Sequence, residues 1–300
     1  MIEISFSNLF IYFNILKERE ETVKGDIFNV YVTILQQTRP LILKSKPQLS
    51  NDNLLVRNNK SRQLTSINNE QIVEEKPVQL LKSQINSIVK SLQKLLKNKS
   101  AKTRQGCFSL LIQLVNVLPG ALNNHLAQIM PGVYYSLNDK SSTSNMKIDT
   151  LNFLNNLLMT HDEQLFHPYL DQLVKPVVKC IQDNFYKIAS DALLVSQQLA
   201  KILRSAYNAN INCMSYINEL YNATLIRLKQ TDIDQEVKER AIVCIAQIIC
   251  NLGDLISTDL QTCWPILVER LKNEITRLTT VKAIHSIAEY VYISIFYQNS

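Results

Sequence analysis

Apolar residues recur through most of the chain at the spacing expected of helices that bury one side. One such helix has apolar residues at i, i+3, i+4, i+7 and i+11, namely Leu126, Ile129, Met130, Val133 and Leu137. A polar stretch from Asn138 to Asn145 follows, and its Ser, Thr and Asn content is typical of a turn that ends in a helix N-cap. A second apolar stripe then appears, formed by Ile148, Leu151, Leu154 and Leu158. The pattern predicts two helices joined by a polar turn.

The same two-helix unit recurs along the chain. Each copy has a basic residue near the start of its second helix and a small residue three positions later. These pairs are Arg104/Cys107, Lys147/Thr150, Lys187/Ser190, Lys238/Ala241 and Arg277/Thr280. Three first helices contain a proline, which removes a backbone donor and bends a helix: Pro131, Pro176 and Pro265. Two-helix repeats of about 40–47 residues are the HEAT or armadillo pattern, so we expect an all-α solenoid, a superhelix of stacked helix pairs.

The chain divides into four parts by this pattern. Residues 1–40 hold a leader that matches no repeat and one helix, expected at Lys17–Thr38 with Ile27, Val30, Tyr31 and Ile34 on one face and an end at Arg39-Pro40. Residues 41–76 are polar and Asn-rich, which indicates a mobile insertion. Five helix pairs are expected within 77–290, near 77–118, 121–160, 165–204, 212–252 and 257–290, followed by a divergent tail at 291–300. Pro119-Gly120 and Gly253 are expected helix stops.

Composition restricts the class of protein. Hydrophobic residues make up 46% of the chain, enough for a core, and five glycines are few, which favours helix over β-structure. The net charge of +6 is spread among acidic residues without a dense basic block, so nucleic acid is not the expected partner. Six cysteines without a CxxC pair indicate buried thiols in a reducing compartment, cytoplasmic or nuclear. No apolar run is long enough to predict a membrane span.

Candidate chemistry is sparse. His161 and His167 lie six positions apart with Asp162 and Glu163 between them, which is not the spacing of a helical metal site. No Gly-rich phosphate loop, GxSxG or HExxH occurs. A solenoid offers an extended curved face rather than a closed pocket, and such a face suits another protein. We therefore expect a protein that is not an enzyme and has no cofactor.

The basic residue of each unit has two interpretations. It pairs with an acidic residue of a neighbouring turn, such as Asp139 or Asp183, or it contributes to a positive ridge that meets an acidic partner. The candidate positions for the second interpretation are Lys140, Lys147, Lys187, Lys238 and Arg240.

Several longer passages resemble one known family. They are TRQGCFSLLIQLVNVLPGAL from Thr103, SLNDKSS from Ser136, DIDQEVKERAI from Asp232, QIICNLGD from Gln247 and ERLKNEITRLTTVKA from Glu269. These passages, together with KEREETVKGDIFNVY from Lys17 and QQTRP from Gln36, closely resemble the cullin-associated NEDD8-dissociated protein family, also called the TATA-binding-protein-interacting proteins of 120 kDa. The resemblance runs from about Lys17 to Ala283, with an interruption at residues 41–76.

The resemblance implies a non-catalytic HEAT superhelix that wraps unneddylated cullin–RING complexes and exchanges the substrate-receptor modules of SCF-type ubiquitin ligases. It aligns the chain with the middle of that arch, which implies a fragment, a truncated gene product or a shortened paralogue, without the family's contact residues at either end. Two alternatives remain open from the residues alone: a generic HEAT adaptor of the transport-receptor or phosphatase-scaffold type, and a nucleic-acid-associated protein.

Overall fold

The computed structural model describes residues 21–45 and 76–298, and within them every regular element is helical. Five first helices follow one another: α3 (Lys76–Leu95), α5 (Leu126–Asn138), α7 (Leu170–Ile181), α9 (Met214–Lys229) and α11 (Ser257–Lys272). Six helices form a second layer: α2 (Glu21–Ser45), α4 (Ala101–Val117), α6 (Ser144–Thr160), α8 (Tyr186–Asn208), α10 (Gln235–Leu252) and α12 (Glu274–Gln298). Two short 3-10 helices, η1 (Asn123–His125) and η2 (Glu163–Tyr169), precede α5 and α7.

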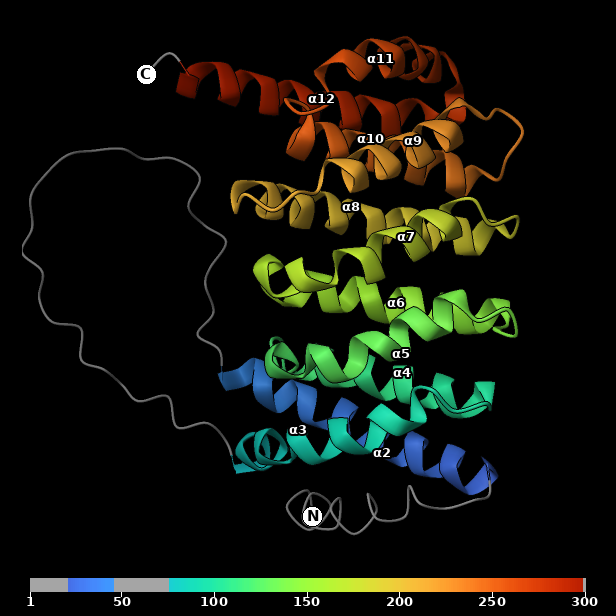
Figure 1. Ribbon diagram of the computed structural model, residues 1–300, viewed down its shortest axis with the longest axis vertical. Helices are drawn as coiled ribbons and strands as arrows, with labels where there is room; N and C mark the ends of the chain where they lie inside the picture. The colour runs from blue at the N-terminus through green and yellow to red at the C-terminus, as the bar shows by residue number, and fades with distance from the viewer. Residues whose placement is uncertain (1–20, 46–75, 299–300) are drawn as a thin grey trace, which may run out of the picture.

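The helix pairs stack in chain order into a two-layer array, with the N-terminal pairs at one end and the C-terminal pair at the other (Figure 1). In one layer α4 lies between α2 and α6, α8 lies between α6 and α10, and α12 packs on α10; in the other, α5 contacts α3 and α7, and α9 contacts α7 and α11. Each repeat therefore contacts its neighbours, which is the defining property of a solenoid. The expected fold class, an all-α solenoid of helix pairs, is confirmed.

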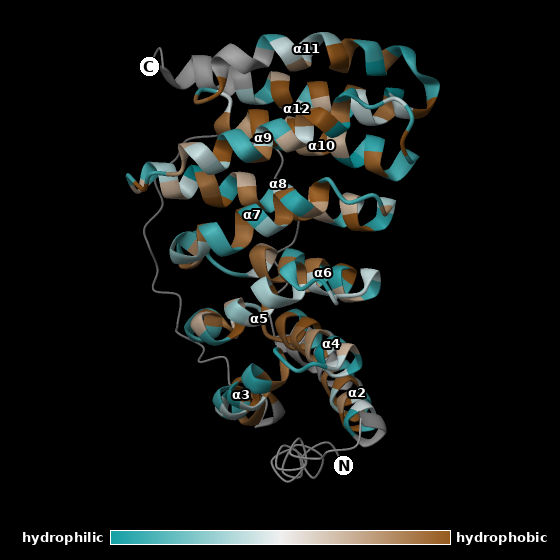
Figure 2. Ribbon diagram, turned by 45° about the vertical axis from the view of Figure 1, so that its right-hand side comes forward, coloured by the Kyte–Doolittle hydropathy of each residue, from teal (hydrophilic) through white to brown (hydrophobic). Residues whose placement is uncertain are grey.

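A continuous apolar core runs between the two layers. Hydrophobic residues face inward on the helices of both layers, while polar residues face outward (Figure 2). The two predicted stripes are found there: Leu126, Ile129, Met130, Val133 and Leu137 of α5 are buried, as are Leu151, Leu154 and Leu158 of α6, and Ile148 packs against them. Thr143 caps α6 by accepting a hydrogen bond from the backbone N–H of Met146, as the polar turn predicted.

The helix that precedes the repeats differs from its expected form. Pro40 does not end α2, which continues to Ser45. A proline costs a helix one hydrogen bond without necessarily ending it, and Pro131, Pro176 and Pro265 likewise lie inside α5, α7 and α11. The buried face of α2 also differs from the expected one. Val30 is 48% exposed, whereas Phe28 and Leu35 are buried together with Ile27 and Tyr31. Of the four positions predicted to share this face, Val30 is therefore wrong, whereas Ile27, Tyr31 and Ile34 do face the core.

Helix α2 occupies an unexpected place in the array. It precedes α3 in sequence, yet it lies in the layer of second helices and packs along α4 (Figure 1). Gly106 of α4 permits this approach, because a Cβ there would lie 2.4 Å from Cδ2 of Phe28. Most of the expected insertion at 41–76 lies outside the described residues, except that 41–45 belong to α2 and Lys76 begins α3.

The two expected helix stops fall where helices end, with different geometry. Gly120 follows α4 and has a φ of +80°, a left-handed conformation that favours glycine. Gly253 follows α10 in a right-handed conformation, and its N–H continues the helical pattern by donating to the carbonyl of Ile249. Of the described helices, none is long and apolar enough to cross a membrane.

Candidate protein-binding surface

The turns between first and second helices carry the basic residues that the sequence singled out. The second helices begin at intervals of 39 to 49 residues, so the turns lie near one another along one edge of the array. The basic side chain of one repeat can therefore reach the turn of the next. The structure shows which of them do so.

Arg104, near the start of α4, is buried with 1% of its side chain exposed. Its Nη1 donates to the carbonyl oxygen of Asn98 at 2.8 Å, and its Nη2 lies 3.6 Å from Asp139 Oδ2, at the end of α5. The guanidinium also lies over the ring of Tyr135, 5.2 Å from the centroid. Arg104 therefore joins its own turn to the next one and is not available to a partner.

Lys147 and Lys187 make the same kind of link in the next two repeats. Lys147 Nζ donates to Asp183 Oδ2 at 2.8 Å, and Lys187 Nζ donates to Glu236 Oε1 at 3.0 Å and lies 3.2 Å from Asp191 Oδ1. Burial would raise the pKa of Asp183, but the hydrogen bonds from Lys147 and the Phe185 N–H, together with the charges of Lys147 and Arg227, outweigh burial and lower it. The hydrogen bond from Lys187 is also the main cause of the lowered pKa of Glu236.

The pairing interpretation is therefore correct at Arg104, Lys147 and Lys187. The other candidates differ: Lys140 is exposed in the α5–α6 turn, Lys238 is half-exposed on α10, and neither makes an ion pair within the described part of the chain. Arg240 is half-exposed. Burial raises the pKa of Asp191, and the charges of Lys187 and Arg240 oppose that rise. The charge of Arg240 also adds to the effect of Lys187 in lowering the pKa of Glu236. Three of the five candidate positions thus retain an unneutralised or weakly neutralised charge.

Arginines near the ends of first helices form a second set of links that the sequence interpretation missed. Arg227 of α9 donates to the carbonyl oxygens of Ile181, the last residue of α7, and of Asp183, two residues later, at 2.6 and 2.8 Å. Arg270 of α11 donates in the same way to Leu228 and Gln230, at the end of α9, at 2.7 and 2.8 Å. These carbonyls have no partner within their helices, so each arginine caps the preceding first helix. The tripeptide RLK recurs at 227–229 and 270–272, and this repetition was the sequence signal from which the two caps could have been predicted.

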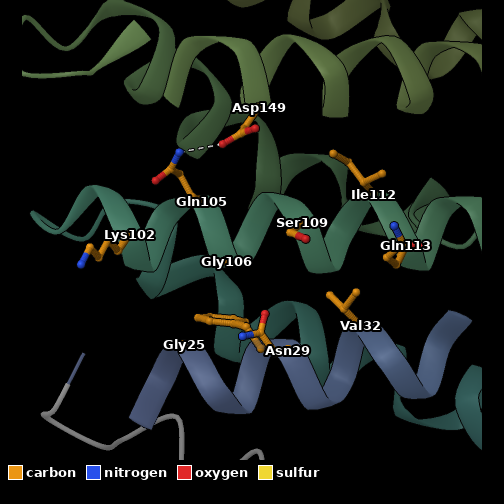
Figure 3. A pocket seen from close by; sticks show the side chains of 11 residues that line it. Gly25, Asn29, Val32, Lys102, Gln105, Gly106, Ser109, Ile112, Gln113 and Asp149 are labelled. Atoms are coloured by element: carbon orange, nitrogen blue, oxygen red, sulfur yellow. Dashed lines mark hydrogen bonds between the residues drawn. The ribbon is translucent and has the colours of Figure 1, made fainter. Parts of the chain in front are cut away.

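A groove lies on the layer of second helices near the N-terminal end of the array. It has a volume of about 500 Å³ and lies between α2 and α4, with Asp149 of α6 at its edge (Figure 3). Its polar lining includes Lys102, Gln105 and Asn29, and Gln105 Nε2 donates to Asp149 Oδ2 at 2.8 Å. Burial raises the pKa of Asp149, and the hydrogen bond from Gln105 opposes that rise. The lining carries no set of groups suited to acid–base or nucleophilic catalysis.

The histidines and cysteines have structural environments. His161 Nε2 accepts a hydrogen bond from the backbone N–H of Leu122 at 3.1 Å, and His167 Nε2 lies 3.1 Å from Ser205 Oγ. Burial lowers the pKa of both histidines. The buried cysteines are unreactive for a related reason. Burial raises the pKa of Cys180 to about 11 and that of Cys244 to about 12, so these thiols stay protonated. No group of three or more potential metal ligands occurs within the described residues.

Known structures resemble this chain in fold. The karyopherin Kap121p bound to the extreme C-terminus of the protein phosphatase Cdc14p superposes with a TM-score of 0.62 at 18% identity, covering 71% of this chain and 20% of Kap121p. Kap121p bound to RanGTP gives a TM-score of 0.59 at 19% identity over the same shares. At this identity the likeness establishes the fold alone, a HEAT solenoid.

Sequence comparisons identify closer relatives. Residues 120–245 match a family model described as CAND1-like, TPR repeats. Cullin-associated NEDD8-dissociated protein 1 of Drosophila melanogaster is 48% identical over 276 residues, that of Arabidopsis thaliana is 40% identical over 273, and protein 2 of Mus musculus is 40% identical over 277. Each alignment covers 91% of this chain and 20% of the relative, so the chain spans about a fifth of the length of these proteins. The chain therefore belongs to the family of cullin-associated NEDD8-dissociated proteins and corresponds to a segment of their repeat region.

Proposed function

We propose that the chain is a non-catalytic segment of a scaffold that binds cullin–RING complexes and regulates the exchange of their substrate receptors. The observation that carries this proposal is the 48% identity to the Drosophila protein, whose name states an association with cullins, over 91% of the chain. A cytoplasmic or nuclear site of action follows from such partners. The extended two-layer fold supports the proposal, because a solenoid offers a long surface for another protein.

The part of the surface that we assign to an acidic partner is the edge that carries Lys140, Lys238 and Arg240. Lys147 and Lys187 belong to the same edge, but their charges are already balanced by Asp183, Asp191 and Glu236. Exposed charges at a rim mainly affect the association rate and its salt dependence. The contact should therefore be sensitive to salt and weak in this segment alone.

A weak contact is expected for a second reason. The chain spans about a fifth of its relatives, and two tethered contacts gain greatly from effective concentration, which a segment with one contact lacks. The segment should bind an unneddylated cullin–RING complex weakly and should not accelerate release of a substrate adaptor. A fluorescence assay of adaptor–cullin dissociation, with and without the chain, measures both properties.

The experiment compares charge reversals on two faces. Lys140→Glu combined with Lys238→Glu should weaken cullin–RING binding, while Lys90→Glu on the exposed side of α3 should leave it unchanged. Equal effects of both sets would remove the assignment to this edge. Absence of cullin and RING subunits from an affinity purification, with transport or phosphatase subunits in their place, would instead favour the generic HEAT adaptor, and nucleic acid lost at high salt would favour the third alternative.

A further inference from the structure

The guanidinium of Arg104 is buried but has too few hydrogen-bond acceptors. It carries five N–H donors. One of them makes a hydrogen bond of ordinary length, from Nη1 to the carbonyl oxygen of Asn98 at 2.8 Å. The contact from Nη2 to Ser142 Oγ is long, at 3.4 Å, and Asp139 lies 3.6 Å away. Nε has no hydrogen-bond partner within the described part of the chain. A buried cation in this state has unused capacity for a stronger acceptor.

The α5–α6 turn places a serine hydroxyl directly at this cation. Ser142 is half-exposed, and its neighbours Lys140, Ser141 and Thr143 are exposed, so the turn is accessible from solvent. Thr143 is the N-cap of the 17-residue helix α6, so Ser142 lies immediately before the positive end of that helix dipole. Lys140 adds an exposed positive charge two residues earlier. The Ser142 hydroxyl is neutral, yet positively charged groups and the positive end of a helix dipole lie on the residues around it.

We propose that Ser142 is a phosphorylation site and that its phosphate binds Arg104. In the reaction a protein kinase transfers the γ-phosphoryl group of ATP: the Ser142 Oγ–P bond forms, the bond from the γ-phosphorus to the bridging oxygen breaks, ADP leaves with that electron pair, and a base of the kinase takes the hydroxyl proton. Phosphoserine carries about −1.5 to −2 charges at pH 7 and three strong acceptor oxygens. The phosphate oxygens supply hydrogen-bond acceptors for the Nη2 and Nε donors of Arg104.

The consequence is a stronger link between neighbouring repeats. Arg104 lies on α4, whereas Ser142 precedes α6, so a short charge-assisted bond between them joins two successive second helices. Asp139 opposes the effect, because its carboxylate lies near the same guanidinium and repels the phosphate. Its pKa is held below the usual range, first by the hydrogen bond from the Ser141 hydroxyl, so Asp139 stays charged at neutral pH.

The decisive test uses the full chain with phosphoserine incorporated at position 142. A titration followed by ³¹P nuclear magnetic resonance gives the second pKa of the phosphate, which is about 6 without a partner. Contact with Arg104 should lower it by about one unit, since an opposite charge favours the dianion. Phosphoserine at Ser144 is the matched control, because Ser144 lies in the same segment and, among the described residues, the Arg104 side chain hydrogen-bonds to Asn98 and Ser142 but not to Ser144.

Two further measurements complete the test. Asp139→Asn should lower the phosphate pKa at position 142 further, and Arg104→Lys should raise it toward the value at position 144. Millimolar inorganic phosphate added to the unmodified chain should leave the Arg104 ¹⁵N–¹H signals unchanged, because the phosphate needs its covalent tether. Equal pKa values at 142 and 144, tight binding of free phosphate, or absence of phosphate on Ser142 in chain isolated from its source cells under phosphatase inhibition would overturn the proposal.

Discussion

His161 shows how a single side chain can join two loops of the array. Its Nε2 accepts from the Leu122 backbone, and its Nδ1 lies 3.0 Å from the carbonyl oxygen of Leu157. This arrangement requires the neutral ring with the proton on Nδ1, because a protonated Nε2 would face another N–H donor. Burial lowers the pKa of His161, while the Leu157 carbonyl and the charge of Asp162 oppose this shift. The histidine therefore stabilises the fold as a neutral group.

The pH dependence follows from the direction of that shift. Since the folded pKa lies below the unfolded value of about 6.5, the stabilisation is present above about pH 6.5 and is lost as pH falls through the folded pKa. Urea unfolding between pH 8 and pH 5 should show a larger loss for the natural chain than for His161→Gln, whose amide oxygen can still accept from Leu122. His285→Gln, at an exposed position, is the control. Identical losses in the natural chain and His161→Gln would contradict this role.

Buried and exposed apolar residues should respond differently to truncation. Leu154→Ala and Ile245→Ala each remove hydrocarbon groups from a fully buried side chain, so each should lower the free energy of unfolding by about 2–5 kcal/mol. Met159→Ala changes a side chain that is 63% exposed on the same helix as Leu154 and should cost less than about 0.5 kcal/mol. Gln128 of α5 is not a suitable polar control, because its side-chain Oε1 is buried. Chemical denaturation of the three variants measures the difference.

At the scale of elements, the contact between α2 and α4 depends on the absence of a side chain at Gly106. The Phe28 ring occupies the space that a Cβ would need, so the two helices approach more closely there than ordinary side chains permit. This contact holds α2 against the array although a long segment separates it from α3 in sequence. A side chain added at Gly106 should therefore weaken the packing of the whole of α2 against α4.

Two glycine substitutions test this contact. Gly106→Ala should destabilise the array by about 1–3 kcal/mol through overpacking against Phe28, despite the higher helix propensity of alanine. Gly25→Ala places the same methyl group where no atom lies within 4 Å, so it should be neutral or stabilise by up to about 1 kcal/mol. Hydrogen exchange of the α2 amides is the measurement. Equal protection of α2 in both variants would show that Phe28 repacks without cost.

At the scale of the whole molecule, the last helix pair presents an apolar face that earlier pairs cover. Leu278 and Val281 of α12 are 65% and 51% exposed, and Trp264, Val268 and Ile275 are also exposed. The residues that occupy the position of Val281 in earlier second helices, four after the basic residue, include Phe108, Leu151 and Ile242, all fully buried. Exposed apolar surface of this kind favours association.

Self-association should therefore depend on this face. Leu278→Gln combined with Val281→Gln should reduce concentration-dependent association in sedimentation velocity, whereas Met159→Gln, an exposed apolar position outside the last pair, should not. The amides of α11 and α12 should also exchange faster than those of α6 and α8, since several apolar side chains of α11 and α12 are exposed. A stable monomer with strong protection throughout residues 257–290 would disprove this prediction.

The amino-acid pattern determined the features that depend on neighbours along the chain. Apolar spacing of 3.6 residues fixed which sides of α5 and α6 are buried, and Ser100 and Thr143 fixed where α4 and α6 begin, because these effects act within one helical turn. The recurrence of two-helix units was also sufficient to predict the solenoid, since each unit must bury its apolar faces against the next.

Tertiary structure alone decided what each charged side chain meets. Sequence spacing left open whether the basic residues face a partner or an acid, and the choice at Arg104, Lys147 and Lys187 follows from acids 35 to 49 positions away that stacking brings within 4 Å. The caps supplied by Arg227 and Arg270, and the place of α2 beside α4, likewise depend on contacts between repeats. Such contacts depend on how helices stack, which local propensity does not specify.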